Sequence, residues 1–366
     1  MVHLIDLGLL GASGAVVAGG VNLSQTFGPG AGVAYGCIVA TSLCAVKMFF
    51  TLPWKTMSGG SHPEISVPYE QEFELYHNSI SFCSQKVRIC AVEKGISYKS
   101  HIIQLIQTGW YQVLSPSFFK INPAGGIPVL VHNGHPVLES DDIVEYLDSI
   151  KEPANTLMPK DEKLAKVAAK WKRQGSLMPS EVGGDGSDST MANCVLPLCL
   201  PLYAVYMRKT PFANILYGLF FHYDKKRPLA FCLVKIFGIY FFEYLLPGKI
   251  ARTIRKSRED IVRCCRDLNA HMRECGGPYI CGNQFTQADI GIIATLERLH
   301  AADGLESIFV KADVPHLQKY WDEVRQRESY KRAIADEELS IVGEGLQQIQ
   351  EWKLRYPKFK EMFELV

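Results

Sequence analysis

The sequence predicts an α/β domain followed by an all-helical domain, with an apolar segment ahead of both. Residues 73–147 contain short strand and helix patterns in the order βαβ, then a ββ hairpin, then α. From Asp161 onward only helical patterns occur, and no Asp, Glu, Lys or Arg occurs from Leu7 to Val46. A chain of 366 residues is long enough for two domains and for an addition of this kind.

The first segment is apolar enough to enter a membrane. Its most apolar part is 31–46, and about 20 apolar residues cross a bilayer as a helix. Gly28–Gly30 interrupts it, so we expect one span or two short membrane-dipping pieces, and a Gly/Ala-rich leader or transit peptide is the alternative. Lys47, Trp54 and Lys55 follow. Because positive side chains favour the cytoplasmic side, we expect the main domains to face the cytoplasm.

The α/β domain is predicted to begin with a strand, a helix and a second strand. Phe73–His77 has the pattern of a short strand. Ser81 can cap the N-terminus of a helix that runs to about Lys94 and ends at Gly95. Residues 98–105 alternate enough to form the second strand of a βαβ unit.

A hairpin and another helix complete this domain. Two strands are predicted at Val129–His132 and His135–Leu138, and Asn133-Gly134 between them is typical of a type I′ turn. Glu139 then opens a helix whose inward face carries Ile143, Val144, Tyr146 and Leu147. This order of elements is the thioredoxin-like arrangement.

The rest of the chain is predicted to be helical. Helices are expected at 161–178, 249–275, 286–303 and 315–332, and one amphipathic helix at 344–363. Between the first two lies a strongly apolar stretch, 190–247, punctuated by Lys and Arg. The predicted domains are an apolar leader or membrane anchor with a linker at 1–60, the α/β domain at 70–152, the helical domain at 158–335 with an apolar insertion at about 183–248, and a helical tail at 336–366.

Composition argues against several classes of function. Lys and Arg number 39 and Asp and Glu 38, with no basic stripe, so we expect no nucleic-acid partner. The 11 cysteines contain no C-x-x-C pair, so we expect neither a metal site nor a dithiol redox motif. Their odd number in a chain of this length favours free thiols in a reducing compartment.

Chemistry is expected first at Cys83, between the first strand and the first helix. Free N–H groups and the dipole at a helix N-terminus stabilise a thiolate, and Lys86 one turn later adds positive charge. These effects predict a lowered thiol pKa and a nucleophilic Cys83. Ser84 could instead hydrogen-bond the thiolate of a bound thiol cofactor. A buried capping cysteine without chemistry is the structural alternative.

Two further positions complete the candidate site. Pro128 stands just before a predicted strand, and a cis Ile127–Pro128 bond would turn the Ile127 main chain outward to pair with an extended ligand. Glu139 and Ser140 begin the next helix, where N–H groups and a hydroxyl suit a carboxylate. An ordinary capping pair is the alternative for these two residues.

Taken together, these motifs resemble the glutathione transferase family. The matching stretches are Tyr76–Lys94, Asn122–Val131, Glu139–Leu147 and Tyr279–Ile290. In the last of them, Thr286 and Asp289 form a structural capping box. The Cys83 region is similar to the cysteine-containing branch that includes the tetrachlorohydroquinone reductive dehalogenases. It is also similar to ganglioside-induced differentiation-associated proteins, which resemble it with Ser at the position of Cys83.

The resemblance implies a thioredoxin-like domain plus the helical domain of a glutathione transferase, with glutathione as the co-substrate. Cys83 would be the catalytic thiol, or Ser84 the hydroxyl that activates glutathione. Ser81 and Lys86 would lie beside the bound thiol, and Ile127–Pro128 would hold its cysteinyl part. The γ-glutamyl end would be held by Glu139 and Ser140. The apolar leader and the apolar insertion depart from soluble transferases.

The expected function is that of a membrane-associated, glutathione-dependent transferase or thiol reductase acting on a hydrophobic electrophile. Conjugation, reductive removal of a leaving group and isomerisation all remain open. The apolar insertion provides aromatic side chains that could line a hydrophobic pocket or dock on lipid. The alternative is a non-catalytic membrane adaptor that keeps the fold and binds a protein partner or remodels membrane. Expected partners are glutathione, a hydrophobic small molecule and membrane lipid, with a possible homodimer.

Overall fold

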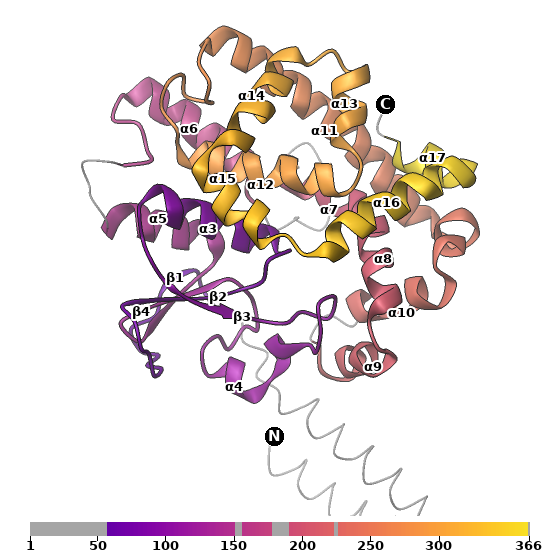
Figure 1. Cartoon of the computed structure of the whole chain (residues 1–366), viewed down its shortest axis with the longest axis horizontal. Helices are drawn as coiled ribbons and strands as arrows, with labels where there is room; N and C mark the ends of the chain where they lie inside the picture. The colour runs from indigo at the N-terminus through magenta and orange to yellow at the C-terminus, as the bar shows by residue number, and fades with distance from the viewer. Residues whose placement is uncertain (1–56, 151–155, 178–189, 223–225, 365–366) are drawn as a thin grey trace, which may run out of the picture.

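The computed structural model describes residues 57–150, 156–177, 190–222 and 226–364 (Figure 1). The predicted membrane segment at 7–50 lies outside the described residues. Within them, an α/β domain and a helical domain pack against each other, as the sequence predicts.

The α/β domain is built on one five-stranded sheet with the strand order β1-β5-β4-β2-β3. The strands are β1 (Gly60–Ser61), β2 (Phe73–His77), β3 (Lys99–Ile102), β4 (Val129–His132) and β5 (His135–Leu138). The helices are α3 (Phe82–Glu93), α4 (Pro116–Phe119) and α5 (Ser140–Ile150), with the short 3₁₀ turn η1 (Gln112–Leu114). Helices α3 and α5 lie together on the side of the sheet that faces the helical domain (Figure 1).

The register of the sheet brings three loop segments to one edge. Strand β4 is antiparallel to both β2 and β5, with Val129 paired to Tyr76 and to Leu138. The end of β2, the start of β4 and the end of β5 therefore lie side by side. The chain leaves the sheet there at 78–81, arrives at 127–128 and leaves again at 139, which are the segments that carry the predicted site.

The helical domain is arranged around the buried helix α12. Its helices are α6 (Glu162–Gln174), α7 (Met191–Leu198), α8 (Leu200–Lys209), α9 (Phe212–Phe221), α10 (Lys226–Phe237), α11 (Gly248–Cys275), α12 (Gln287–Ala301), α13 (Leu305–Lys311), α14 (Pro315–Gln326), α15 (Glu328–Ala333), α16 (Ser340–Arg355) and α17 (Pro357–Phe363), with a π-helical turn η3 (Phe241–Leu245) and a 3₁₀ turn η4 (Ala335–Glu337). The predicted capping box of Thr286 and Asp289 begins α12 and is confirmed.

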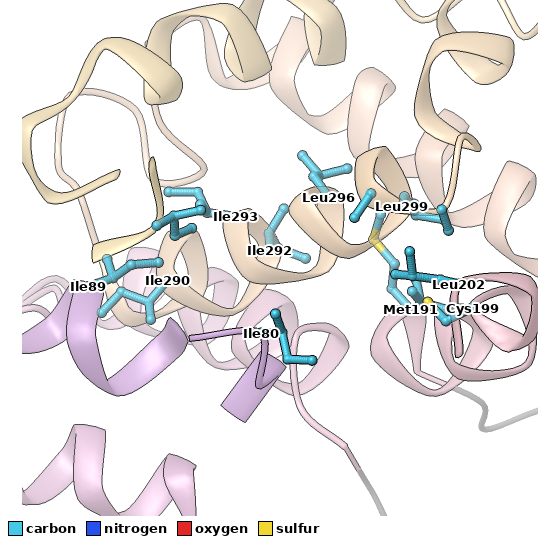
Figure 2. Packing of buried hydrophobic residues seen from close by; sticks show 14 of the residues in the cluster. Ile80, Ile89, Met191, Cys199, Leu202, Ile290, Ile292, Ile293, Leu296 and Leu299 are labelled. Carbon is cyan, nitrogen blue, oxygen red and sulfur yellow. The ribbon is translucent and has the colours of Figure 1, made fainter. Parts of the chain in front are cut away.

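One hydrophobic core joins the two domains. Ile89 of α3 lies against Ile290 of α12, and farther along α12 the side chain of Leu299 faces Met191 and Leu202 of the insertion (Figure 2). Helix α12 is buried on nearly all sides, because α3, α6, α7 and α16 all pack on it. Burial of this much apolar surface is the main force that holds the two domains together.

The insertion forms a layer of short helices rather than long ones. Pro197 lies inside α7 and Pro201 in the first turn of α8, and Gly238 with φ 54° follows α10. Proline removes a helical N–H, and a positive φ ends a helix. No single helix among the described residues is long and apolar enough to cross a membrane; α7 and α8 reach that length only as a pair bent by 47°.

Several predicted boundaries are wrong. The tail forms α16 and α17 because Pro357 begins a new helix, and the helix predicted at 315–332 is divided at Arg327. The predicted linker contains strand β1, which pairs with β5, and the second predicted strand is only Lys99–Ile102. Such short edge elements depend on pairing partners that are distant in sequence.

Candidate functional site

Cys83 lies in the first turn of α3, as predicted. Ser81 is the N-cap, and its hydroxyl accepts a hydrogen bond from the Ser84 main-chain N–H at 3.3 Å. The Cys83 side chain is half-buried and free of any disulfide. Because the N–H groups of a first helical turn have no partner within the helix, Cys83 stands in a region of positive potential.

The predicted lowering of the Cys83 pKa is wrong. Burial raises the pKa of this thiol, and the negative charges of Asp141 and Glu139 raise it further. The Lys86 charge and a hydrogen bond from the Ser140 side chain act in the opposite direction but do not outweigh burial. Desolvation disfavours the charged form of a thiol, so Cys83 rests as a protonated thiol.

Lys86 is committed to an ion pair and is not a free cation beside the thiol. Its side chain is only 2% exposed, and its ammonium pairs with the Asp141 carboxylate at the start of α5. It also lies over the Phe82 ring, 5.5 Å from the ring centroid. The pair joins the N-terminal turns of α3 and α5, and it neutralises one of the carboxylates beside the site.

The Ser84 hydroxyl is closed off from solvent. The residue is fully buried, and its hydroxyl accepts a hydrogen bond from the Asn78 main-chain N–H at 3.4 Å. A ligand sulfur would reach this hydroxyl only after the loop before α3 had moved. The structure therefore favours Cys83 over Ser84 as the group that meets a ligand.

The Ile127–Pro128 peptide bond is cis. The loop before it is held by Asn122, whose amide donates to the Gly126 carbonyl at 2.8 Å and accepts from the Ala124 N–H at 2.9 Å. Within the described part of the chain, the N–H and C=O of Ile127 make no hydrogen bond. This main-chain edge can therefore pair with an extended ligand, as predicted.

Glu139 and Ser140 form the other end of the site. Glu139 has φ 64°, a left-handed conformation that is uncommon for a residue with a side chain, and its carbonyl accepts from Ile143 N–H at 2.8 Å in the first turn of α5. Burial and the nearby Asp142 and Asp141 raise the pKa of Glu139. Ser140 is buried with its side chain toward Cys83. Two helix N-termini, those of α3 and α5, therefore converge on one point.

A small apolar cluster from α3 and the helical domain packs behind the thiol. Phe82, Ala192 of α7 and Ala294 of α12 form a small buried cluster, and Cys83 and Leu177 pack on it. The first three side chains are 8%, 2% and 0% exposed, so they pack behind Cys83 and fix its position.

Two buried arginines that the sequence analysis missed hold the loop before α3. Arg88 of α3 donates to the carbonyls of Asn78 at 3.1 Å and Ser79 at 3.0 Å. Arg298 of α12 donates to the carbonyl of Ile80. Three successive carbonyls thus bind guanidinium groups, which fixes the approach to Ser81. An arginine within the otherwise apolar run 87–92 is the sequence signal that could have identified Arg88.

Neither a metal site nor a disulfide is found among the described residues. Their nine cysteines are all free, and no group of three or more His, Cys, Asp and Glu side chains could hold a metal ion.

Comparison with known proteins gives the same family for both domains. Residues 80–150 match the family described as "Glutathione S-transferase, N-terminal domain", and residues 251–323 match "Glutathione S-transferase, C-terminal domain". Glutathione S-transferase TCHQD of Arabidopsis thaliana is 30% identical over 266 residues, which is 71% of this chain and 89% of that protein.

Two other similar proteins extend the comparison. The human ganglioside-induced differentiation-associated protein 1-like 1 is 22% identical over 75% of this chain and 77% of its own length. The crystal structure of β-etherase LigF from Sphingobium sp. strain SYK-6 has a TM-score of 0.57 at 19% identity, covering 72% of this chain and 98% of that one. The last likeness shows that the fold is shared.

Proposed function

Because the chain belongs to the glutathione S-transferase family, we propose that it is a glutathione-dependent enzyme in which Cys83 meets the glutathione sulfur and the second substrate is a hydrophobic electrophile. The observation that carries this proposal is the convergence of Cys83 and Ser140 at two helix N-termini, with a buried apolar cluster packed behind the thiol. The half-buried thiol and the unpaired Ile127 main chain support it further.

The described residues suit two parts of glutathione, the γ-glutamyl unit and the cysteinyl unit with its sulfur. The N-terminal turn of α5 at Ser140 would bind the γ-glutamyl carboxylate, because free N–H groups at a helix start attract an anion. The Ile127 N–H and C=O would pair with the cysteinyl unit as an added strand. The Lys86–Asp141 ion pair lowers the negative charge that would otherwise oppose the carboxylate. The glutathione sulfur would then lie at Cys83.

Conjugation is the chemistry that this geometry supports best. Cys83 rests as a protonated thiol, so its S–H can donate a hydrogen bond to a glutathione thiolate. A positioned donor lowers the pKa of the glutathione thiol and raises the fraction of nucleophile at neutral pH. The thiolate would attack an electrophilic carbon, the new carbon–sulfur bond would form, and any leaving group would depart with its electron pair.

Thiol reduction is the second chemistry, and the half-exposed position of Cys83 favours it. Cys83 would first give up its thiol proton, and its sulfur would attack the sulfur of a glutathione conjugate. The carbon–sulfur bond breaks, and the carbon leaves with the electron pair and takes a proton. Cys83 is left in a mixed disulfide with glutathione. A second glutathione thiolate would release glutathione disulfide and restore Cys83. Glutathione itself would be the resolving thiol, because Lys86 stands where a C-x-x-C motif has its second cysteine.

Two substitutions of Cys83 distinguish these chemistries. Under conjugation, Cys83→Ser retains a donor and most of the turnover with a panel of apolar electrophiles, whereas Cys83→Ala loses about 10²-fold or more in kcat. Under thiol reduction both variants lose turnover, and mass spectrometry detects a glutathione adduct on wild-type Cys83. Full activity of Cys83→Ala would exclude both of these roles for Cys83. No binding of glutathione and no turnover in the wild-type chain would leave the non-catalytic adaptor hypothesis.

We also propose that the chain works at a membrane with its two domains on the cytoplasmic side. The apolar composition of residues 7–46, followed by Lys47, Trp54 and Lys55, supports this placement. Fractionation of full-length chain tests it: the protein should remain with membranes, and protease added from the cytoplasmic side should digest both domains.

A further inference from the structure

A cationic cavity lies far from Cys83, between the insertion and the C-terminal helix α16. Its volume is about 490 Å³, and it lies where the chain turns after α10 beside the last turns of α16. Arg208, Lys235 and Arg355 line it together with a single carboxylate, that of Glu351. Three cations against one anion make the cavity suited to a negatively charged group.

The three cations are held in place without being neutralised. The Lys235 ammonium donates to the carbonyls of Met207 and Arg208, both at 3.0 Å, where it closes the C-terminal end of α8. Arg208 donates to the neutral amide of Gln348 at 3.0 Å. Arg355 is exposed and takes part in none of the ion pairs of the described residues. Each cation therefore keeps donors that an anion could use.

An exposed apolar rim adjoins the cavity. Ile236, Phe237 and Tyr240 belong to the cavity wall and are 56%, 40% and 56% exposed. Tyr240 stacks on Tyr244, which is 65% exposed and lies 5.1 Å below the Lys358 ammonium. Apolar side chains gathered in one segment differ from the scattered ones of an ordinary surface, and such patches mark interaction sites.

We propose that this face docks on the surface of an anionic membrane, with a lipid phosphate group in the Arg208–Lys235–Arg355 cavity and the rim of Ile236, Phe237, Tyr240 and Tyr244 in the interface. Basic side chains attract the negative leaflet, and tyrosines favour the headgroup level. A soluble phosphate would use the cations but would leave the rim exposed to water. The combination of cavity and rim therefore selects a lipid.

This inference deepens the proposed membrane location and does not depend on the glutathione chemistry. The residues of the face belong to α8, α10, α16 and the turns beside them, whereas the site around Cys83 lies at the start of α3 (Figure 1). Changes at the face should leave turnover with glutathione unaltered. The two proposals can therefore fail separately.

The test is a comparison of charge reversals in the full-length chain. Arg208→Glu with Arg355→Glu reverses two exposed cations of the cavity, and Lys319→Glu with Lys331→Glu makes the same change in net charge on α14 and α15. Binding is measured by sedimentation with phosphatidylcholine vesicles and with vesicles that also contain phosphatidylserine. Wild type and the control pair should bind the anionic vesicles more tightly, and the cavity pair should lose about tenfold or more of that preference.

A second variant tests the rim, and its circular dichroism and turnover show whether a loss of binding comes from misfolding. Ile236→Ser with Tyr244→Ser should weaken binding to both kinds of vesicle by a similar factor, while circular dichroism and glutathione turnover stay at wild-type levels. Equal preference for anionic vesicles in wild type and the cavity pair would overturn the proposal. So would abolition of that preference by millimolar inorganic phosphate, since the cavity would then be a site for free phosphate.

Discussion

At the scale of single residues, the candidate site depends on charges whose effects are set by burial. Lys86 and Cys83 are three residues apart, yet the lysine pairs with Asp141 and leaves the thiol protonated. Asp289 shows the same principle away from the site, because burial raises its pKa to about 6 although it accepts hydrogen bonds from Ile280, Thr286 and Tyr320. In both cases the effect of desolvation on the pKa is larger than the opposing effect of the neighbouring hydrogen-bond donors and charges.

His77 at the end of β2 predicts a pH dependence of stability. Its Nδ1 accepts from Arg88 at 3.2 Å and its Nε2 bonds Ser100 Oγ at 2.8 Å, and burial lowers its pKa from 6.5 to about 3. Below pH 6.5 the unfolded chain binds a proton that the folded chain excludes, so stability falls as pH falls through this window. His77→Gln should reduce the slope of the unfolding free energy there by about 1 kcal/mol per pH unit.

Urea unfolding at several pH values measures this slope. The exposed His316, substituted by Gln, is the matched control and should leave the slope as in wild type. A wild-type slope in the His77→Gln chain would mean that His77 titrates normally in the folded state.

At the scale of elements, helix α3 presents Cys83 correctly only while the loop before it is held. Arg88 donates to Ala333 at 2.7 Å as well as to Asn78 and Ser79. Arg88→Lys keeps the charge but cannot reach these three carbonyls at once. We expect a loss of about 2–4 kcal/mol of unfolding free energy and faster amide exchange at 78–85. Hydrogen exchange read by mass spectrometry, with the exposed Arg173→Lys as control, tests this expectation.

The packing of α6 on α12 predicts a second effect at this scale. The two helices meet at Gly175 and Gly291, and a Cβ built on Gly175 would lie 2.5 Å from the main-chain carbon of Gly291. Gly175→Ala should therefore destabilise the chain by about 1–3 kcal/mol through overpacking. Gly343→Ala in α16 meets open space and should stabilise by about 0.4–1 kcal/mol. Chemical denaturation measures both, and equal effects of the two substitutions would contradict the close approach.

At the scale of the whole molecule, the two domains share one core and should unfold together. Arg327, between α14 and α15, binds Glu93 of α3 through two bonds of 2.5 and 2.7 Å and lies over the Phe285 ring. Arg327→Met should lower the unfolding free energy by about 2–4 kcal/mol while leaving a single transition. Arg332→Met, at an exposed pair, should change it by less than about 0.5 kcal/mol.

Calorimetry of the Arg327→Met chain tests the sharing of the core. A single transition with a lower midpoint is the expected result. Two separate transitions in the wild-type chain would show that the domains unfold independently, and the continuous core seen around α12 would then contribute little to their association.

Local patterns were enough to determine much of this protein from its sequence. Ser81, Asn133-Gly134 and the Thr286–Asp289 capping box mark their turns and helix starts, and the structure confirms them. These features depend on neighbours within a few residues, so periodicity and capping preferences suffice to find them. The position of Cys83 at a helix start was predictable for the same reason.

The tertiary structure alone decided which groups meet and what burial does to them. Two contacts, Lys86 with Asp141 and Cys83 with Ser140, join segments that are up to 57 residues apart. The burial of Ser84 depends on the residues that cover it. The sequence prediction of a lowered Cys83 pKa failed because it counted charges and not desolvation. Only the folded chain fixes how much water each group loses, and that loss sets its charge.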